Sequence, residues 1–290
     1  MKYRGLTLLK EEGHPVKKCC ELLSISPSGF YDWMRRGPSK KEQRDGLLKA
    51  KILSIFGNSK KTYGSPRIQK SLQASGEKVG KDKVAQLMRE EGLSAKKKKA
   101  FRPKTTINNP SDKKSPRVFK IKETTVTGPN QVWVSDLTYL PTGSGFSYLV
   151  TVMDLFNREI KGWDVSDTMD AVNTKNALLK ALRTTPGRLN GLIFHSDQGV
   201  QYCASEFREK VNLLNITQSM SRKGNCYDNA FAESFFGTMK SELEFNSFEN
   251  LDEAKREIFK YINWYNRERM HSSLGYVSPV EYRIKNCLTA

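Results

Sequence analysis

The sequence predicts an α/β protein in which a mixed β-sheet domain follows small all-α units. One observation is a change of period: apolar residues recur at helical spacing before about residue 95, and β-rich runs begin after Pro129. Another is the order of the later elements, where three successive strands precede alternating helices and strands. The third is charge, because the net charge of +18 is distributed unevenly along the chain.

Two helices near the start are predicted to pack as a pair. Residues 16–23 form a short helical pattern, and Ser26 with Pro27 starts a second helix that ends in Arg35 and Arg36. This pattern is typical of a helix-turn-helix DNA-binding motif: a helix, a tight turn and a second helix with a basic end. Two short helices also occur in proteins that never bind DNA, so this outline alone leaves both interpretations open.

A second helical unit is predicted before the sheet domain. Residues 49–56 have a helical pattern, Ser65 precedes a proline and is placed to cap the next helix, and residues 82–91 form a helix that Gly92 ends. From Lys96 to about residue 122 the chain is rich in Lys, Pro, Thr and Asn and has no sustained periodicity. This composition predicts a basic linker.

The elements of the sheet domain follow from alternation and composition. Strands are expected at residues 131–140, 146–154, 159–164, 192–195 and 216–219, and helices at 173–183 and 206–214. A last helix follows a basic turn at 221–225 and carries Glu233, with Asp228 and Asn229 able to cap it. Asp136 and Asp197 lie where strands end or pass the sheet face, near which ligands of such sheets gather.

The excess positive charge lies in the first part of the chain. Residues 1–125 hold 31 Lys and Arg against 12 Asp and Glu, whereas residues 126–290 hold 18 against 19. An excess confined to one region is typical of nucleic-acid binding, which we favour over a merely solvated basic surface. No apolar run approaches membrane-spanning length and no secretory signal is recognisable, so we expect an intracellular, cytoplasmic protein.

The cysteines and histidines do not predict a zinc module. The five cysteines form no C-x-x-C pair, and three histidines cannot build such a module by themselves. We therefore expect reduced, buried or incidental thiols.

Three acids have a spacing that points to one site. Asp136 and Asp197 are separated by 60 residues, Asp197 and Glu233 by 35, and Lys240 follows Glu233 by seven positions on the same helix face. The acids occur in W-V-S-D-L-T-Y, H-S-D-Q-G-V-Q-Y and D-N-A-F-A-E-S-F-F-G-T-M-K, and Y-N-R-E-R-M-H-S-S-L-G-Y-V-S-P-V-E-Y follows near the C-terminus.

These segments resemble the D,D(35)E signature of retroviral integrases and bacterial insertion-sequence transposases, and together they resemble the OrfB proteins of the insertion-sequence-three family. The resemblance runs from Y-G-S-P-R-I to S-P-V-E-Y, which is most of the chain. It implies a ribonuclease-H-like catalytic core with Asp136, Asp197 and Glu233 as catalytic residues and metal ligands, and magnesium as the cofactor. The implied function is a DNA transposase that cuts and transfers strands at the ends of its element.

Carboxylates suit this phosphodiester chemistry. Attack needs a deprotonated oxygen nucleophile and relief of charge on the leaving oxygen, and two divalent ions about 4 Å apart can supply both. Carboxylates and water suit Mg²⁺, for which Mn²⁺ can substitute. Because three clustered acids repel one another, we expect the site to assemble fully only with metal and DNA. Strand transfer is a transesterification that needs no ATP, and the chain has no P-loop.

Further residues are predicted to bind DNA or to support the acids. The predicted DNA-binding residues are Lys240, Arg222, Lys223, Arg35, Arg36, Arg67, Lys97 and Lys98, and the predicted auxiliary residues are His195, Gly199, Gln201 and Asn229. His195 is expected to orient its neighbours or to lie in the core, and Gly199 to permit the turn that aims Asp197. Structural roles are favoured for Asp154 and Asp164. For the aromatic segment at 263–269, packing is at least as good an interpretation as DNA contact.

The predicted organisation has five segments. They are a helix-turn-helix-like region at 1–57, a second helical DNA-binding unit at 58–100, a basic linker at 101–125, the catalytic core at 126–245, and a C-terminal helix and tail at 246–290. Expected partners are double-stranded DNA, as terminal inverted repeats and as target, and further copies of the chain on that DNA. A protein encoded by an upstream frame is another candidate partner. The alternatives are an inactive DNA-binding protein or repressor, and a structure-selective nuclease.

Overall fold

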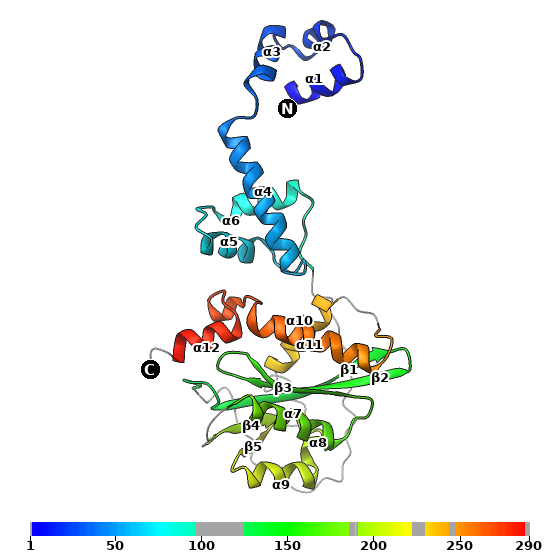
Figure 1. The fold of residues 1–290 in the computed structure, drawn as a ribbon, viewed down its shortest axis with the longest axis vertical. Coiled ribbons are helices and arrows are strands. Elements are labelled where there is room, and N and C mark those ends of the chain that lie inside the picture. Colours follow the sequence, from blue (N-terminus) through cyan, green and yellow to red (C-terminus); the bar gives the residue numbers. More distant parts are fainter. Residues whose placement is uncertain are drawn as a thin grey trace.

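The computed structural model describes residues 2–96, 125–185, 189, 191–221, 230–243 and 247–287. The predicted linker lies almost wholly outside these residues, as does the basic turn at 222–225. Figure 1 shows three parts along the long axis: a small helical group at the N-terminal end, a second helical group around α4, and the sheet domain at the other end.

The N-terminal group consists of α1 (Lys2–Glu11), α2 (Val16–Leu23) and α3 (Pro27–Arg36). The sequence patterns predicted α2 and α3 but not α1, which supplies Leu6 to the small core that these helices share. Ser26 caps α3 as predicted, because its Oγ accepts a hydrogen bond from the Gly29 N–H at 3.4 Å. A short proline-started helix with an exposed basic end therefore forms here.

The second group consists of α4 (Lys40–Asn58), α5 (Ser65–Ala74) and α6 (Lys81–Glu90). Helix α4 begins nine residues before its predicted pattern, at Lys40, because Ser39 and Glu42 form a capping box there. The predicted cap at Ser65 is wrong: Ser65 is the first helical residue, and the N-cap Gly64 has no side chain to offer. Gly92 ends the next helix as predicted, with φ at +65°.

The sheet has five strands in the order β3-β2-β1-β4-β5. The strands are β1 (Val132–Thr142), β2 (Gly145–Asp154), β3 (Ile160–Ser166), β4 (Ile193–Ser196) and β5 (Thr217–Met220). The first three pair antiparallel, whereas β4 pairs parallel to both β1 and β5. The predicted mixed sheet is thus confirmed, with each of the five strands near its predicted position.

Helices cover both faces of the sheet (Figure 1). The helices on the two faces are α7 (Ala171–Arg183), α8 (Val200–Cys203) and α9 (Ser205–Leu213) on one side, and α10 (Ala230–Leu243) and α11 (Leu251–Arg267) on the other. Alternation along β1 separates two cores: Trp133 packs with the α7–α9 side, and Val134 with the α10–α11 side. A 3₁₀ turn (Ser272–Leu274) and α12 (Pro279–Cys287) complete the C-terminal region.

Gly162 explains how closely α7 lies on the sheet. A Cβ atom at this position of β3 would overlap the Ala177 carbonyl oxygen and lie 2.5 Å from the Ala181 nitrogen. Both of these are backbone atoms of α7, which cannot move aside as a side chain can. Only glycine therefore allows this strand and helix to meet backbone to backbone.

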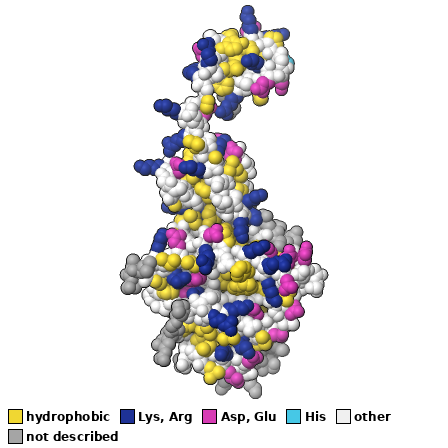
Figure 2. All heavy atoms as spheres, in the orientation of Figure 1, with side chains coloured by type: hydrophobic (Ala, Val, Ile, Leu, Met, Phe, Trp, Pro, Cys, Tyr) yellow, Lys and Arg dark blue, Asp and Glu magenta, His cyan; other side chains and the backbone are white. Residues whose placement is uncertain are grey.

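Basic side chains are spread over the face of the molecule that Figure 2 shows. Figure 2 shows Lys and Arg side chains along both helical groups and down to the sheet domain. Within the described ranges, no helix is both long and apolar enough to cross a membrane.

Candidate functional site

Asp136 and Asp197 are brought together by parallel strand pairing. In the register of β1 and β4, Val134 lies opposite His195. Asp136 is two residues beyond Val134, and Asp197 is two residues beyond His195, directly after the last residue of β4. If this register is continued past the end of β4, Asp197 comes to the level of Asp136 on β1, although 60 residues separate the two acids in sequence.

The charges of Asp197 and Glu233 both reach Asp136. Burial raises the pKa of Asp136 well above its ordinary value, and the charges of Asp197 and Glu233 raise it further. A hydrogen bond from the Leu137 N–H to Asp136 Oδ1 at 2.9 Å opposes this rise in pKa. Burial also raises the pKa of Asp197 and of Glu233. Each acid is thus less readily ionised than a free carboxyl group, so a bound cation would lower the cost of charging them.

Helix α10 presents the third acid and a cation. The helix packs against β1, Glu233 is exposed in its first turn, and Lys240 is half-buried near its end. The Lys240 ammonium lies 4.7 Å from the centre of the Tyr139 ring on β1, and burial lowers the pKa of this lysine. A carboxylate and a cation therefore stand two turns apart on the helix above the strand that carries Asp136.

The donor set fits a hard divalent cation. All three candidate ligands are carboxylates, and none is a histidine or a thiolate, so oxygen-preferring ions such as Mg²⁺ suit them better than zinc. Among the described residues, no three Asp, Glu, His or Cys side chains are gathered closely enough to hold a metal ion together. Asp136, Asp197 and Glu233 are therefore in an open arrangement and do not form a closed three-ligand group in this structure.

His195 links β4 to the neighbouring strand. Its ring is buried; Nδ1 lies 2.9 Å from Ser219 Oγ and Nε2 lies 3.3 Å from Ser221 Oγ. Both serines belong to β5 or follow it directly. This arrangement holds the end of β4, from which Asp197 projects.

Gly199 lies against Asp197 for a reason other than the predicted one. Its φ is −58°, which any residue can adopt, so the turn itself does not require glycine. A Cβ atom here would lie 3.0 Å from Asp197 Oδ1 and 2.8 Å from Gln201 Oε1. The Gly199 N–H also donates a hydrogen bond to Asp197 Oδ1 at 3.0 Å. Gly199 therefore makes room for these two side chains, and Gln201 is itself buried.

Asp154 and Asp164 have structural partners. Buried Asp154 accepts hydrogen bonds from the N–H groups of Asn130 and Phe156, at 2.7 and 2.9 Å. Asp164 on β3 forms an ion pair with Lys180 on α7 at 2.7 Å. Both acids therefore hold elements of the sheet domain together.

Comparison with known proteins places this arrangement in a family. Two models described as an integrase core domain match residues 126–226 and 214–279, and a model described as an HTH-like domain matches residues 42–101. The insertion element IS600 31 kDa protein of Shigella sonnei is 42% identical over 268 residues, which cover 92% of this chain and 97% of that protein. The transposase of insertion sequence element IS904 from Lactococcus lactis is 39% identical, over 87% of this chain and all of that protein. Together with a 35% identical transposase of insertion sequence IS3A, these relatives show that the chain belongs to the insertion-sequence-three family of transposases.

Other relatives agree with this assignment. The InsF transposase of insertion sequence IS3A from Escherichia coli is 35% identical over 93% of this chain and 94% of that protein. Among solved structures, the HTLV-2 integrase catalytic core domain in complex with magnesium matches 54% of this chain at 18% identity, with a TM-score of 0.42. The transposase relatives and the family models show that the chain is a DNA transposase with an integrase-type core and an HTH-like region.

The predicted DNA-binding residues of the transposase lie in different surroundings. Arg35 and Arg36 are exposed at the end of α3. Arg67 in α5 is half-buried, its guanidinium 5.5 Å from the centre of the Tyr63 ring. Five predicted site residues lie outside the described residues: Lys97, Lys98, Arg222, Lys223 and Asn229.

Sequence reasoning missed the residues that lie beneath the acids. The Tyr202 hydroxyl of α8 shares a hydrogen bond of 2.8 Å with Ser135 Oγ on β1, and both side chains are buried. Burial raises the pKa of Tyr202 well above its ordinary value, and the charges of Asp136 and Asp197 raise it further. Both residues occur in the sequence segments around the acids, but nothing in those segments shows that their side chains meet.

The aromatic segment at the end of α11 packs inside the protein. Trp264 and Tyr265 are buried, and the buried Arg269 pairs with Glu242 of α10. This supports the packing interpretation of the segment over DNA contact. The burial of its partner Glu242 could not be predicted from the sequence, because an acid near the end of a helix is usually solvated.

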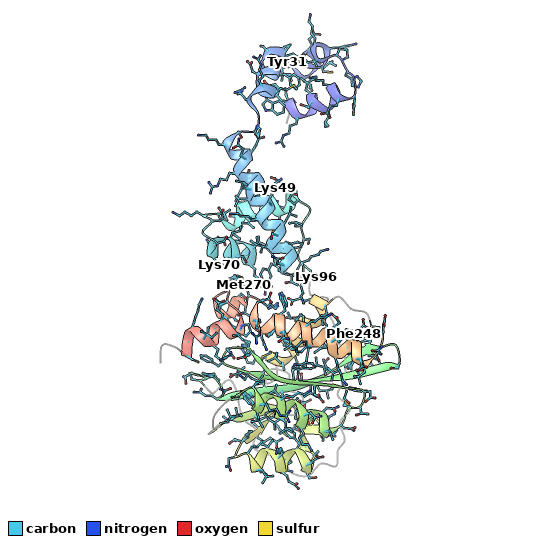
Figure 3. The ribbon with its side chains drawn as sticks, viewed as in Figure 1. Tyr31, Lys49, Lys70, Lys96, Phe248 and Met270 are labelled. Atoms are coloured by element: carbon cyan, nitrogen blue, oxygen red, sulfur yellow. The ribbon has the colours of Figure 1, made fainter. Side chains whose placement is uncertain are left out.

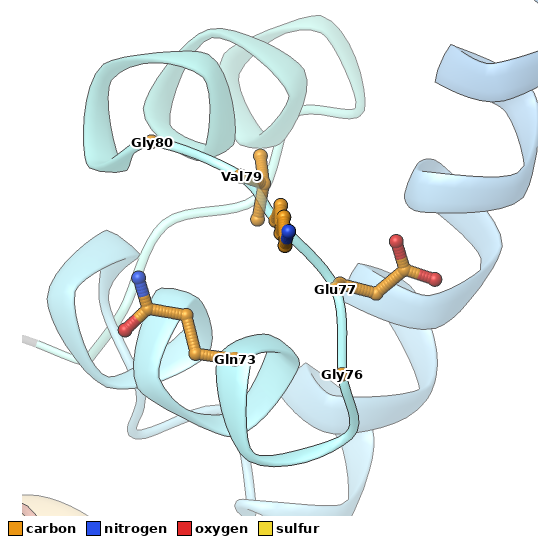
Figure 4. Close-up of a pocket in the computed structure, with 6 residues that line it drawn as sticks. Gln73, Gly76, Glu77, Val79 and Gly80 are labelled. Carbon is orange, nitrogen blue, oxygen red and sulfur yellow. The ribbon is translucent and has the colours of Figure 1, made fainter.

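A hollow in the helical region does not join this site (Figure 4). It lies at the turn between α5 and α6 and is lined by Gln73, Gly76, Glu77, Lys78, Val79 and Gly80. The carboxylate of Glu77 already pairs with Lys51 at 2.5 Å. The candidate site of the transposase therefore remains the group of acids on the sheet.

Proposed function

We propose that Asp136, Asp197 and Glu233 form the catalytic centre of the transposase and bind the divalent ions that its chemistry requires. The observation that supports this proposal is the parallel pairing of β1 and β4, whose last pair, Val134 and His195, stands two residues before each of the acids Asp136 and Asp197. The raised pKa of Asp136, to which both Asp197 and Glu233 contribute, is the further support. The expected reaction is cleavage at the element's ends followed by transfer of the 3′-hydroxyl to a target phosphate.

The proposed cofactor is Mg²⁺, most simply two ions, with Mn²⁺ able to replace it. When bound, the ions would activate the attacking hydroxyl and offset charge on the leaving oxygen. The three carboxylates would hold them, which also removes the mutual repulsion that raises the pKa of Asp136. The open arrangement of the acids fits a centre that closes when metal and DNA bind.

Other residues of this chain have positioning roles in the proposal. Lys240 would contact a phosphate of the DNA end, because its ammonium stands on the same helix as Glu233, above β1. Tyr202 and Ser135 would fix β1 to α8 next to Asp136 through their buried hydrogen bond. His195 would keep the end of β4, and with it Asp197, fixed to β5.

The helical regions would recognise the terminal repeats. The proposed contacts come from Arg35 and Arg36 of α3 and from basic residues of the HTH-like region. Two ends must be joined in transposition, so we propose that two or more copies act together on DNA. A protein from an upstream frame is a further proposed partner.

The test is an end-cleavage and strand-transfer assay with the purified full chain, DNA bearing the element's ends, and Mg²⁺. Asp197→Asn and Glu233→Gln should each lower cleavage by about 10²-fold or more, because each removes a charge that acts in the transition state. DNA binding should persist in both variants. Asp170→Asn and Glu209→Gln, which make the same changes at exposed positions of the sheet domain, serve as matched controls.

Intact cleavage in the Asp197 and Glu233 variants would contradict the assignment of the acids. A wild-type protein that binds the ends without cutting them would favour the inactive binding protein. Cutting without preference for the terminal repeats and without strand transfer would favour the structure-selective nuclease.

A further inference from the structure

One short segment after α11, residues 268–270, is held by the helical unit α4–α6. The Tyr63 hydroxyl of that unit accepts a hydrogen bond from the Met270 N–H at 2.7 Å and donates one to the Glu268 carbonyl oxygen at 3.2 Å. Tyr63 is buried, so water does not readily replace these bonds. The hydroxyl thus acts as donor and acceptor at once, so both hydrogen bonds form only when residues 268–270 keep one conformation relative to Tyr63.

The residue between these two contacts binds the helix that carries Glu233. The buried Arg269 guanidinium forms a two-pronged pair with Glu242 of α10: Nε lies 2.8 Å from Oε2, and Nη2 lies 2.6 Å from Oε1. The Tyr261 hydroxyl donates a further hydrogen bond to Glu242 Oε2 at 2.8 Å. Such a pair fixes both the position and the rotation of the carboxylate. Glu242 follows Lys240 by only two positions.

Other contacts bridge the same two parts of the molecule. The Lys96 ammonium, at the end of the described helical region, donates a hydrogen bond to the Glu242 carbonyl oxygen at 3.0 Å. The ammonium of Lys60 lies 5.2 Å from the centre of the Trp264 ring, and that of Lys70 lies 5.8 Å from the Tyr276 ring. Figure 3 shows Lys70, Lys96 and Met270 where the helical unit meets the sheet domain. Buried apolar residues of the two parts also belong to one continuous core.

We propose that Tyr63, Lys96, Arg269 and Glu242 form a rigid joint that sets where the DNA end lies relative to the acids. The inference rests on the proposed function of the HTH-like region and of the acids. The joint connects the helical unit through segment 268–270 to α10, and α10 carries both Glu233 and Lys240. Tyr63 is therefore a positioning residue: it selects which phosphodiester of a bound end reaches the acids.

The test compares Tyr63→Phe with wild type in the full-length protein. The substitution keeps the ring and removes only the hydroxyl that makes both bonds. Tyr282→Phe, the same change on α12, is the matched control, because the Tyr282 ring packs against Phe156 rather than the helical unit. Cut positions on end-bearing DNA are mapped to single nucleotides, and hydrogen–deuterium exchange is measured in the metal-free protein without DNA.

Tyr63→Phe should spread cleavage from the principal phosphodiester to its neighbours and lower cutting at the principal position by about tenfold, since a small misplacement is costly. The affinity for the end should stay within about twofold, because the hydroxyl forms its hydrogen bonds with segment 268–270 and the change keeps the Tyr63 ring and every basic side chain of the helical unit. Amide exchange should become faster in α5, in residues 268–270 and in α10, and remain unchanged in β1 and β2. Lys96→Met should likewise spread the cut positions and speed amide exchange in the same segments. Tyr282→Phe should behave as wild type.

If Tyr63→Phe changes neither the cut positions nor the amide exchange of α10, the proposed joint is contradicted. A slower reaction at the same single position would also overturn it, because a merely structural residue would act in that way. If the wild-type protein does not cut DNA, the proposed function fails, and exchange in α5 and α10 still decides whether the joint exists.

Discussion

The side chain of Asp136 shows how single residues prepare the site. It is half-buried on β1, and its pKa is raised by burial, by Asp197 and by Glu233. Its carboxylate accepts a hydrogen bond from the Leu137 N–H, which lowers the pKa and compensates in part. A carboxyl group in these surroundings gains most from a bound cation, because the cation offsets both desolvation and repulsion.

Gly199 offers a test at the residue scale. Gly199→Ala would set a methyl group against Asp197 Oδ1 and Gln201 Oε1, both of which are side-chain ends that can move. Stability should therefore change little, whereas cleavage should fall by about tenfold to a hundredfold because the Asp197 carboxylate is displaced. Melting temperature and end cleavage are the two measurements.

Gly46→Ala is the control for this change. Its added Cβ would meet nothing within 4 Å, and the residue lies inside α4. This variant should be as stable as wild type or more so, since alanine favours a helix by about 1 kcal/mol over glycine. Full cleavage activity in Gly199→Ala would contradict the role given to Gly199.

At the element scale, α10 and the chain after α11 depend on each other. Apolar residues of α10 such as Phe235 and Met239 pack into the core, Glu233 faces solvent, and Glu242 is buried against Arg269. The segment that follows α11 also places His271 beside Arg269, with its Nε2 3.3 Å from the Arg269 guanidinium. Burial lowers the pKa of His271 to about 3, and the charges of Arg269, Arg67 and Arg158 contribute.

His271 predicts a pH dependence of stability. Folding keeps this imidazole neutral, so the unfolded chain takes up the proton first as pH falls below about 6.5. The neutral His271 therefore contributes to the free energy of unfolding above about pH 6.5, and this contribution is lost as the pH falls toward 3. Between pH 7 and pH 5 the loss should be at most about 2 kcal/mol, which is several degrees in melting temperature.

Melting curves of His271→Gln and wild type at pH 7 and pH 5 test this prediction. The variant should lose less stability on acidification, because glutamine does not titrate and can still accept a hydrogen bond from Arg269. His14→Gln, an exposed position before α2, is the matched control. Equal losses in His271→Gln and wild type would contradict the prediction.

At the scale of the whole molecule, charge and chemistry are separated. The positive excess lies in residues 1–125, which include both helical groups, whereas the acids lie in the sheet domain, which is nearly neutral. This division suits a protein that binds the DNA backbone with one part and cuts with another.

Changing Arg35 and Arg36 together to glutamine should weaken binding of the element's end. The slope of log affinity against log salt should fall by about two if each arginine contacts one phosphate. Arg183→Gln with Arg208→Gln removes the same charge from α7 and α9 and should leave both quantities unchanged. Affinity measured at several salt concentrations decides between these outcomes. Equal losses from the two pairs would show that only overall charge matters.

The class of fold and the strand positions could be predicted from the sequence because the signals for both are local, and short motifs marked the three acids as candidates. Strand alternation, helix periodicity and proline or glycine signals depend on neighbouring residues, and the motif words around the acids are short. Local patterns missed α1 and α8, which are short or lack a clear cap, and placed the cap of α5 one residue late.

The tertiary structure decided which residues meet. Asp136 and Asp197 become neighbours only through the parallel pairing of β1 and β4, and Tyr63 reaches the Met270 backbone across 207 residues. The buried pair of Glu242 and Arg269 likewise depends on how α10 lies beside the end of α11. A sequence pattern records the preferences of one segment, whereas these contacts arise from the packing of several segments around shared cores. The sequence by itself therefore determined which acids are the candidate ligands, and only the tertiary structure decided what surrounds and holds them.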